Sequence, residues 1–449
     1  MSNKLLIYEL NEIPKRLLDY YVKLRPSSNL AFIYQKGIKI NTLSTDEGEL
    51  HPWTTWPTFY RGVDNTIHKI RFLNQDKNIA KNYPPAWEIL NKNNISIGIF
   101  GSLQSYPPIK DKNIKFYLPD TFSPSSDAYP KYLSRFQKFN LNICSNNSVI
   151  SRRIRFLEIY NFFLCVINLD FDFKSLFILL NHLIKEFFNK LHKKRRSLLQ
   201  PVLGFSVFKK LLYKHKPDFC TFYSNHLAGM MHRYWFDIFP NDFKNYFRKA
   251  DEFNKKSIIK ALDIADNQIG ELIKFSLRNS YELWIASSMG QKAFVRENRE
   301  KLFINDLNLF LKSIGLNSNN YSKLPSMYPD LNLRCESKNH LDKLIKTINV
   351  LRTEKGKKIL KLRYKPVNNT VNLKIENHEE KFSFIMINNK KLDLKKLGAN
   401  FLPRMTGSGY HIPEGILLIY GNKNIDIYDK KEIQTKEVLS IVLKKFNLN

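Results

Sequence analysis

Residues 4–24, KLLIYELNEIPKRLLDYYVKL, hold the pattern that decides the fold. The run KLLIYEL (4–10) is short, continuously apolar and followed by a polar turn, which predicts a buried strand. PKRLLDYYVKL then begins with Pro14 and predicts a helix, because proline suits the first helical position. A buried strand that leads directly into a helix is the repeating unit of an α/β sheet.

Four further apolar runs have the same character and flank or follow predicted helices. They are ISIGIFG (95–101), DFCTFYS (218–224), YELWIASS (281–288) and GILLIYG (415–421). We therefore predict an α/β fold that is doubly wound, with a mostly parallel central sheet and helices on both faces. Ligands in such folds bind beyond the carboxyl ends of the strands, so the polar residues after these runs are the candidates for a site.

Two segments interrupt this pattern. Residues 126–214 are basic, aromatic and helical with little strand character, and we predict a helical basic cap insertion there. Residues 331–399 contain a helical stretch and several alternating stretches, which predict a small α+β insertion. The predicted core is then made of residues 1–125, 215–330 and 400–449.

Composition narrows the classes of partner. The chain has 449 residues, 72 basic and 41 acidic, which gives a formal charge of +31. Such a charge fits nucleic acid, a membrane surface or anionic substrates. Lysine, asparagine and isoleucine are abundant all along the chain, however, and this biased composition explains the charge without a nucleic-acid footprint. No RNA-binding signature or zinc-finger spacing is found, and we do not expect nucleic acid to be a partner.

The compartment is predicted from cysteines and apolar runs. The four cysteines are scattered without CxxC spacing, which favours a reducing compartment, and the N-terminus does not have the pattern of a signal peptide. The cytoplasm is therefore the compartment that we expect. The longest apolar window, residues 156–188, is broken by Asp170, Asp172 and Lys174. Because KKRR follows at 193–196, an interfacial helix in peripheral contact with an anionic membrane, at its inner face, stays an alternative.

Several short motifs occur together in a recognisable order. They are TWP (55–57), HKI (68–70), NHLAGMMHRYW (225–235), IASSMGQ (285–291) and GSGYHIPEGILLIYG (407–421). Each motif alone is weak, but their number and order resemble the alkaline phosphatase superfamily, in its type I phosphodiesterase/nucleotide pyrophosphatase-like branch. The resemblance covers about half of the chain and implies an alkaline phosphatase-like core.

The resemblance implies a metal-dependent phosphoester chemistry with altered ligands. Members of the family use a threonine or serine nucleophile and two divalent metals, usually zinc. The positions that match and are kept are Thr55 for the nucleophile, and His232 and His411 for metal ligands. The family's acidic or histidine ligands are replaced at Asn11, Ala228, Ser288 and Met289. We therefore do not expect a standard two-metal centre, because a neutral amide, a hydroxyl and a thioether bind zinc poorly.

A rearranged site for one divalent metal, zinc or manganese, is the remaining metal hypothesis. It would use His232, His411 and a substitute acid. Glu12 is the best placed acid because it follows Asn11 directly at the end of the first strand, whereas Asn11 itself is a weak ligand candidate.

Three residues are candidates for substrate binding. Arg61 follows Thr55 closely and would offset phosphate charge. Gln291 follows the altered Ser-Ser-Met-Gly turn and could donate a hydrogen bond to an anion. His226 could turn toward the same edge of the sheet.

The nucleophile and ligand candidates also have structural alternatives. Thr55 could cap a helix, and His232 could be a packed histidine on an aromatic helix face.

Two functions follow from these observations. The first is a phosphoric ester hydrolase or phosphoryl transferase with a reduced or altered metal site, in which Thr55 attacks an anionic phosphoester of a small molecule or glycan. The alternative is a non-catalytic pseudoenzyme that binds an anionic sugar, a lipid phosphate or a protein partner, in envelope or surface-polysaccharide assembly.

Overall fold

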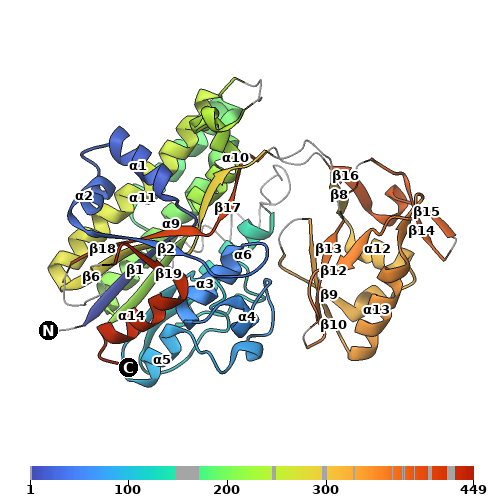
Figure 1. The fold of residues 1–449 in the computed structure, drawn as a ribbon, viewed down its shortest axis with the longest axis horizontal. Coiled ribbons are helices and arrows are strands. Elements are labelled where there is room, and N and C mark those ends of the chain that lie inside the picture. The colour runs from blue at the N-terminus through green and yellow to red at the C-terminus, as the bar shows by residue number, and fades with distance from the viewer. Residues whose placement is uncertain are drawn as a thin grey trace. The chain divides into compact units, whose positions relative to one another are not determined.

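The chain forms two compact units in the computed structural model (Figure 1). Unit 1 consists of Met1–Ile70, Ala80–Val295 and Gly407–Asn449, and unit 2 of Arg71–Ile79 and Arg296–Thr406. The structure describes residues 3–146, 171–244, 249–295, 301–326, 329–366, 368–376, 378, 380–388, 390–402, 407–421 and 430–448.

Unit 1 is built on an eight-stranded sheet. Its strands, in spatial order, are β19 (Glu432–Gln434), β2 (Ile38–Leu43), β18 (Glu414–Tyr420), β6 (Tyr281–Ser287), β1 (Lys4–Leu10), β5 (Phe219–Ser224), β3 (Ile97–Phe100) and β4 (Ile114–Leu118). Neighbouring strands pair in parallel except at β18, which is antiparallel to both β2 and β6. All five strands predicted from the sequence lie in this sheet, so the mixed α/β fold with a mainly parallel central sheet is confirmed.

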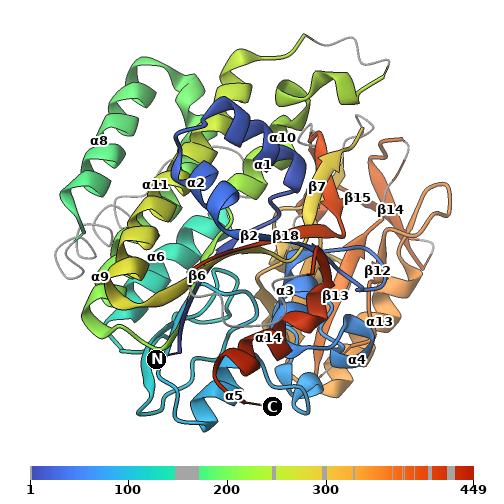
Figure 2. The same cartoon turned by 60° about the vertical axis from the view of Figure 1, so that its left-hand side comes forward.

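Both faces of the sheet are buried, as the continuous apolar strands require. In β1, Leu6 and Tyr8 belong to one hydrophobic core, while Leu5 and Ile7 belong to another, because successive side chains point to opposite faces. The first core is covered by the helices α1 (Lys15–Leu24), α2 (Asn29–Lys36), α9 (Leu199–His215), α10 (His226–Ile238) and α11 (Glu252–Asn279). The second is covered by α3 (Pro52–Arg61), α5 (Ala86–Lys92) and α14 (Val438–Lys445). Figures 1 and 2 show α2 and α11 on one side of the sheet and α3 and α14 on the other.

Residues 133–146 and most of residues 173–214 are helical. They include α6 (Leu133–Asn146), α8 (Phe173–Phe188), the 3-10 segment η2 (Lys190–Leu198) and α9. Phe205 and Phe208 of α9 lie in the same core as Leu6 and Tyr8 of β1, so this helix is part of the packing of unit 1. The domain boundaries given above stay a prediction. No helix within the described ranges is both long enough and apolar enough to cross a membrane.

Unit 2 has its own hydrophobic core and antiparallel sheets. One sheet has the order β12 (Leu360–Leu362), β13 (Thr370–Ile375), β10 (Leu331–Cys335), β9 (Tyr321–Leu324). A second has the order β11 (Arg352–Thr353), β14 (Phe384–Ile387), β15 (Lys390–Asp393), and β16 (Ala399–Leu402) pairs with β8 (Lys301–Ile304). The helices of this unit include α12 (Leu307–Ser313) and α13 (Lys338–Val350).

Glu9 is a fully buried carboxyl group in the middle of the large sheet. Its Oε1 accepts hydrogen bonds from the hydroxyls of Tyr60 at 2.7 Å and Ser102 at 2.6 Å. Burial nevertheless raises the pKa of Glu9 from 4.5 to about 7, since removing a carboxylate from water costs more than these hydrogen bonds return.

This pKa predicts how stability changes with pH. Protonated Glu9 contributes to the free energy of unfolding, and this contribution is fully present below pH 4.5 and is lost as the pH rises through about 7. Between these two values Glu9 ionises in the unfolded chain but stays protonated in the folded chain. The loss amounts to about 3 kcal/mol. The variant Glu9→Gln cannot ionise, so its stability relative to the parent chain should increase between pH 5 and pH 8 by roughly that amount. Urea unfolding followed by tryptophan fluorescence at both pH values measures the difference. A difference that does not change with pH would contradict the prediction.

Candidate functional site

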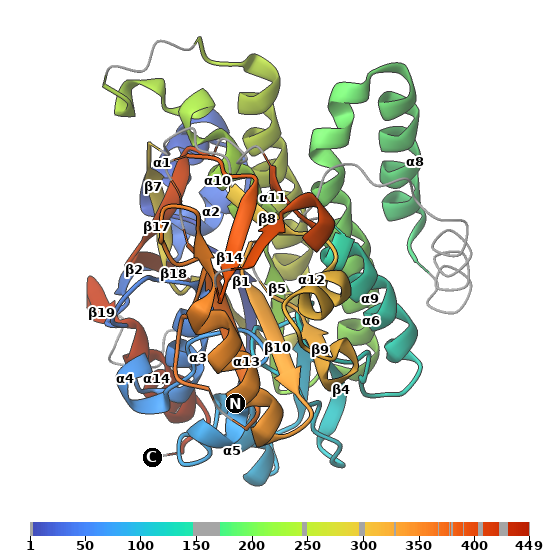
Figure 3. The same ribbon diagram turned by 90° about the vertical axis from the view of Figure 1, so that its right-hand side faces the viewer.

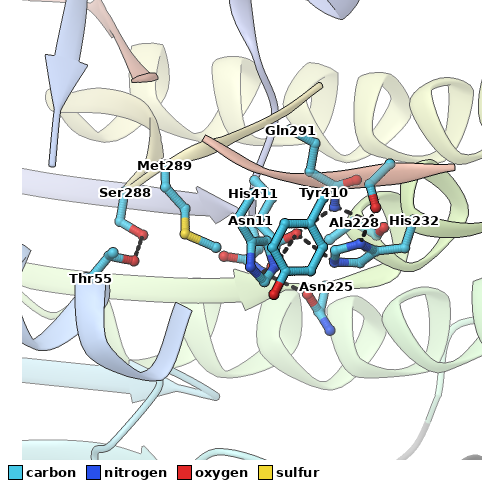
Figure 4. A network of polar contacts seen from close by, with 12 residues as sticks. Asn11, Thr55, Asn225, Ala228, His232, Ser288, Met289, Gln291, Tyr410 and His411 are labelled. Atoms are coloured by element: carbon cyan, nitrogen blue, oxygen red, sulfur yellow. Dashed lines mark hydrogen bonds and ion pairs between the residues drawn. The ribbon is translucent and has the colours of Figure 1, made fainter. Parts of the chain in front are cut away.

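The carboxyl ends of three adjacent strands lie side by side in unit 1. β1 pairs with β5 on one side and with β6 on the other. The pairing of β1 with β5 continues past the strand end, since the Asn11 amide donates to the Ser224 carbonyl at 3.1 Å. Polar residues that follow these strands therefore meet at one edge of the sheet, where Figure 4 shows a connected network of side chains.

Glu12 stands at the start of this network in a backbone conformation that is unusual for its residue type. Its φ is +62°, in the left-handed region. This conformation costs a residue with a Cβ about 1–2 kcal/mol, whereas it costs glycine almost nothing. The carboxylate held in this conformation is almost completely buried. Strain of this kind is concentrated at functional sites.

The Glu12 carboxylate is surrounded by two imidazoles and two amides. Its Oε2 lies 3.0 Å from Nε2 of His232 and 3.5 Å from Nε2 of His411, and it also accepts a hydrogen bond from Gln291 Nε2. Its Oε1 accepts from Asn11 Nδ2 at 2.9 Å. Burial by itself would raise the pKa of Glu12, but the electrostatic interactions and hydrogen bonds with His411 and His232 outweigh it and hold the pKa well below 4.5. The group is therefore an anion at neutral pH.

The two histidines come from different parts of the chain and are oriented by the backbone. His232 lies on α10, and its Nδ1 donates to the Gly409 carbonyl at 3.0 Å. His411 lies on β17 (Gly409–Ile412), which pairs with β7 (Gly290–Ala293) so that His411 stands opposite Gln291. A Cβ at Gly409 would come within 2.5 Å of the Met231 carbonyl oxygen and 2.6 Å of Gln291 Oε1. Only glycine at 409 therefore lets β17 approach α10 closely enough for the two rings to meet.

These three residues fit a divalent metal. Because Nδ1 of His232 donates to a carbonyl, the lone pair of a neutral ring is on Nε2 and faces the Glu12 carboxylate. Two electron-pair donors at 3.0 Å need a proton or a cation between them. One ligand atom from each of Glu12, His232 and His411 lies within 4.8 Å of the other two. Ligands of zinc stand about 3.3 Å apart in tetrahedral geometry, and three protein ligands with an open position are typical of catalytic zinc.

Asn11 and Asn225 orient the carboxylate. The Nδ2 of Asn11 donates to Glu12 and, at 2.7 Å, to Asn225 Oδ1, while its Oδ1 accepts from the Trp56 indole at 2.8 Å. Asn11, which the sequence suggested as a weak ligand, thus makes contacts that hold Glu12 in place. Asn225 was missed in the sequence. It directly follows β5, so the expectation that polar residues after the strands form the site would have found it.

Thr55 lies in the first turn of α3 and is fully buried. Its Oγ1 forms a hydrogen bond of 2.7 Å with Oγ of Ser288, which follows β6. The residue at the N-cap of α3 is His51, so the alternative that Thr55 caps this helix does not apply. In Figure 4, Met289 lies between the Thr55–Ser288 pair and the histidines. The Thr55–Ser288 pair is also connected to the Glu12 network through Trp56, which follows Thr55 in sequence and donates a hydrogen bond to Asn11.

Gln291 belongs to the network, whereas Arg61 and His226 are held elsewhere. Gln291 Nε2 also donates to the Ala228 carbonyl at 3.2 Å. The Arg61 guanidinium donates to the Ala80 and Tyr83 carbonyls. His226 accepts from the Ser224 hydroxyl at 2.8 Å and donates to the Ala261 carbonyl at 2.8 Å, and burial lowers its pKa to about 4. These contacts anchor Arg61 and His226 within the fold, and a substrate-binding role for them stays a prediction.

The fold and this site define an α/β protein with a candidate Glu/His/His metal site at the carboxyl edge of its sheet. Comparison with known proteins gives no matching protein-family model and no matching curated protein. Among solved structures, the chain is similar to the murine ectonucleotide pyrophosphatase/phosphodiesterase 5, with a TM-score of 0.42 and 12% identity over 99% of this chain and 95% of that chain.

An inactive form of the same murine protein in complex with AMP has a TM-score of 0.41 and 13% identity, over 99% of this chain and 95% of that chain. The human protein has a TM-score of 0.41 and 11% identity, with the same coverage. At such low TM-scores and identities, the function has to be inferred from the site itself.

Proposed function

We propose that this protein is a phosphoric ester hydrolase or phosphoryl transferase with a single divalent metal, zinc or manganese, and with Thr55 as the nucleophile. The observation that carries the proposal is the Glu12–His232–His411 cluster, whose ligand atoms lie within 4.8 Å of one another. It is built on a strained residue at the edge of the sheet where α/β proteins bind ligands.

Each part of the chain has a task in this mechanism. When bound by Glu12, His232 and His411, a divalent metal would supply Lewis-acid polarisation of a phosphoryl oxygen. Ser288 holds the Thr55 hydroxyl in one orientation through the 2.7 Å hydrogen bond. Attack by Thr55 Oγ1 would form a bond to phosphorus and break the bond between phosphorus and the leaving alcohol oxygen, which takes up the proton that the Thr55 hydroxyl loses. Water or an acceptor hydroxyl then takes the phosphoryl group from Thr55. The substrate class is an anionic phosphoester of a small molecule or glycan.

The alternative, a non-catalytic pseudoenzyme that binds an anionic ligand, is favoured by one observation. Thr55 is fully buried, and the polar group that it contacts is the neutral Ser288 hydroxyl, with the Met289 thioether beside the pair. A nucleophile usually has a base or a metal within reach. Under this alternative the fold and the cluster serve binding alone.

One experiment separates the two functions. Purified protein is dialysed, its zinc and manganese are measured by elemental analysis, and release of nitrophenol from an aryl phosphodiester is followed with each metal added. The proposal expects metal close to one equivalent and metal-dependent release. A metal-free protein without activity on a panel of phosphoesters would favour the pseudoenzyme.

A further inference from the structure

The helix α8 exposes its apolar side to solvent. Phe173, Phe187 and Phe188 are 91%, 84% and 81% exposed, and further large apolar residues between them are exposed as well. Within α8, Phe173, Phe177, Leu180, Ile184 and Phe187 repeat at alternating intervals of four and three residues, which places them on one side of the helix, and the exposed Leu191 follows in η2. A surface of this kind marks an interaction site.

The side of α8 that faces unit 1 mixes polar and apolar residues. Leu176 and Leu179 are partly buried against the hydrophobic core, and the most deeply buried residues are Ser175, His182 and Glu186. Glu186 forms an ion pair with Arg196 of η2, and His182 Nε2 lies 3.7 Å from Glu186 Oε2. These contacts fix the rotation of the helix, and they turn the phenylalanines outward. Figure 3 shows α8 at the outer edge of unit 1, and its neighbours among the described elements are α9 and η2.

The charges around this surface are of one sign. Lys174, Lys185, Lys190, Lys193 and Lys194 are exposed, and none of them forms an ion pair within the described part of the chain. The two acids of the described segment 171–198 are both neutralised. Asp172 pairs with Lys209 at 3.0 Å, and Glu186 pairs with Arg196. The exposed surface of α8 and η2 thus combines large apolar side chains with unpaired lysines.

We propose that α8 and η2 form a docking surface for an anionic lipid membrane, on which α8 lies parallel to the bilayer plane. Phenylalanines along one side would enter the boundary between headgroups and acyl chains, and the lysines beside them would contact anionic headgroups. A protein partner would need a surface of matching shape, whereas a lipid bilayer accepts any apolar stripe flanked by lysines. This inference does not depend on the proposed phosphoester chemistry.

The test is flotation of the purified full-length chain with vesicles of phosphatidylcholine alone or of phosphatidylcholine with one-third phosphatidylglycerol. The chain should float with the anionic vesicles, and less so as salt is raised. Replacing Lys190, Lys193 and Lys194 by glutamine should reduce the partition coefficient by about fivefold per lysine, or about a hundredfold in all. Phe177→Ser and Phe187→Ser should each reduce it by about tenfold, since each removes one buried phenyl ring.

Matched controls separate this surface from general charge and hydrophobicity. Lys338, Lys343 and Lys346 are exposed on α13, and Leu277 is exposed on α11. Replacing these three lysines by glutamine, or Leu277 by serine, should leave flotation unchanged. Three results would overturn the proposal: no flotation of the parent chain, equal loss in the control variants, or a dimer in light scattering that Phe177→Ser dissociates while vesicles remain unbound. Metal content, measured on the same preparations, should not change in any of these variants, so failure here leaves the proposed function intact.

Discussion

The variant Glu12→Gln should bind zinc at least about a hundredfold more weakly than the parent chain. Glutamine keeps the size of the side chain and can still accept the hydrogen bond from Asn11. It removes the negative charge that lies within 3.0 Å and 3.5 Å of the two histidine nitrogens. Mutating a residue that only contacts a metal ligand typically weakens metal binding tenfold to hundredfold. Loss of a direct ligand should weaken zinc binding more than this, because two neutral imidazoles seldom hold zinc against water.

The measurement is a zinc titration in competition with a chromophoric chelator, together with metal analysis after dialysis. Glu9→Gln is the matched control, because Glu9 is also a buried glutamate of the same segment and contacts Tyr60 and Ser102 instead of the histidines. Glu12→Gly is a second test. It removes the cost of a positive φ at this position, which offsets part of the stability lost with the contacts to Asn11 and Gln291, and the variant should also fail to bind zinc. Zinc affinity that survives in both variants would exclude Glu12 as a ligand.

The variant Thr55→Ala should lose phosphodiesterase activity by about a thousandfold or more, since the attacking oxygen is removed. The measurement is nitrophenol release under the conditions in which the parent chain is active. Thr55→Ser keeps an oxygen at the same place and should retain measurable activity. Thr55→Ala also leaves the buried Ser288 hydroxyl without its 2.7 Å partner, which should lower stability by about 1–3 kcal/mol.

Ser288→Ala separates these two effects of the Thr55 substitution. It breaks the same hydrogen bond as Thr55→Ala but leaves the attacking oxygen in place. We therefore expect a similar loss of stability in thermal unfolding and a much smaller loss of turnover. Activity of Thr55→Ala equal to that of the parent chain would remove Thr55 from the mechanism.

The strands were predictable where burial on both faces makes them continuously apolar. KLLIYEL, for example, is β1 without a change of bounds. The direction of β18 was not predictable, because a fully buried strand has the same composition whether it runs parallel or antiparallel to its neighbours. Strand β2 was missed since its sequence IKINTL includes the exposed Lys39 and lacks a continuous apolar run.

The site was predictable in part. Glu12 and Ser288 follow β1 and β6 and lie at one edge of the sheet, because the carboxyl ends of parallel neighbours meet there. Arg61 lies six residues after Thr55 on α3, and six residues correspond to about 600° of rotation, so the two side chains leave the helix in different directions. The left-handed backbone of Glu12 was not visible in the sequence either, since glutamate carries no sign of a positive φ.

The ribbon of β7 and β17 also connects the two units of the chain. β7 ends at Ala293, β17 begins at Gly409, and the two residues stand opposite each other in the pair. The chain leaves unit 1 after Val295 and re-enters it at Gly407, so unit 2 takes the place of a hairpin turn. Both ends of segment 296–406 are therefore joined covalently to the ribbon that carries Gln291 and His411, whereas the other segment of unit 2, Arg71–Ile79, joins unit 1 at Ile70 and Ala80.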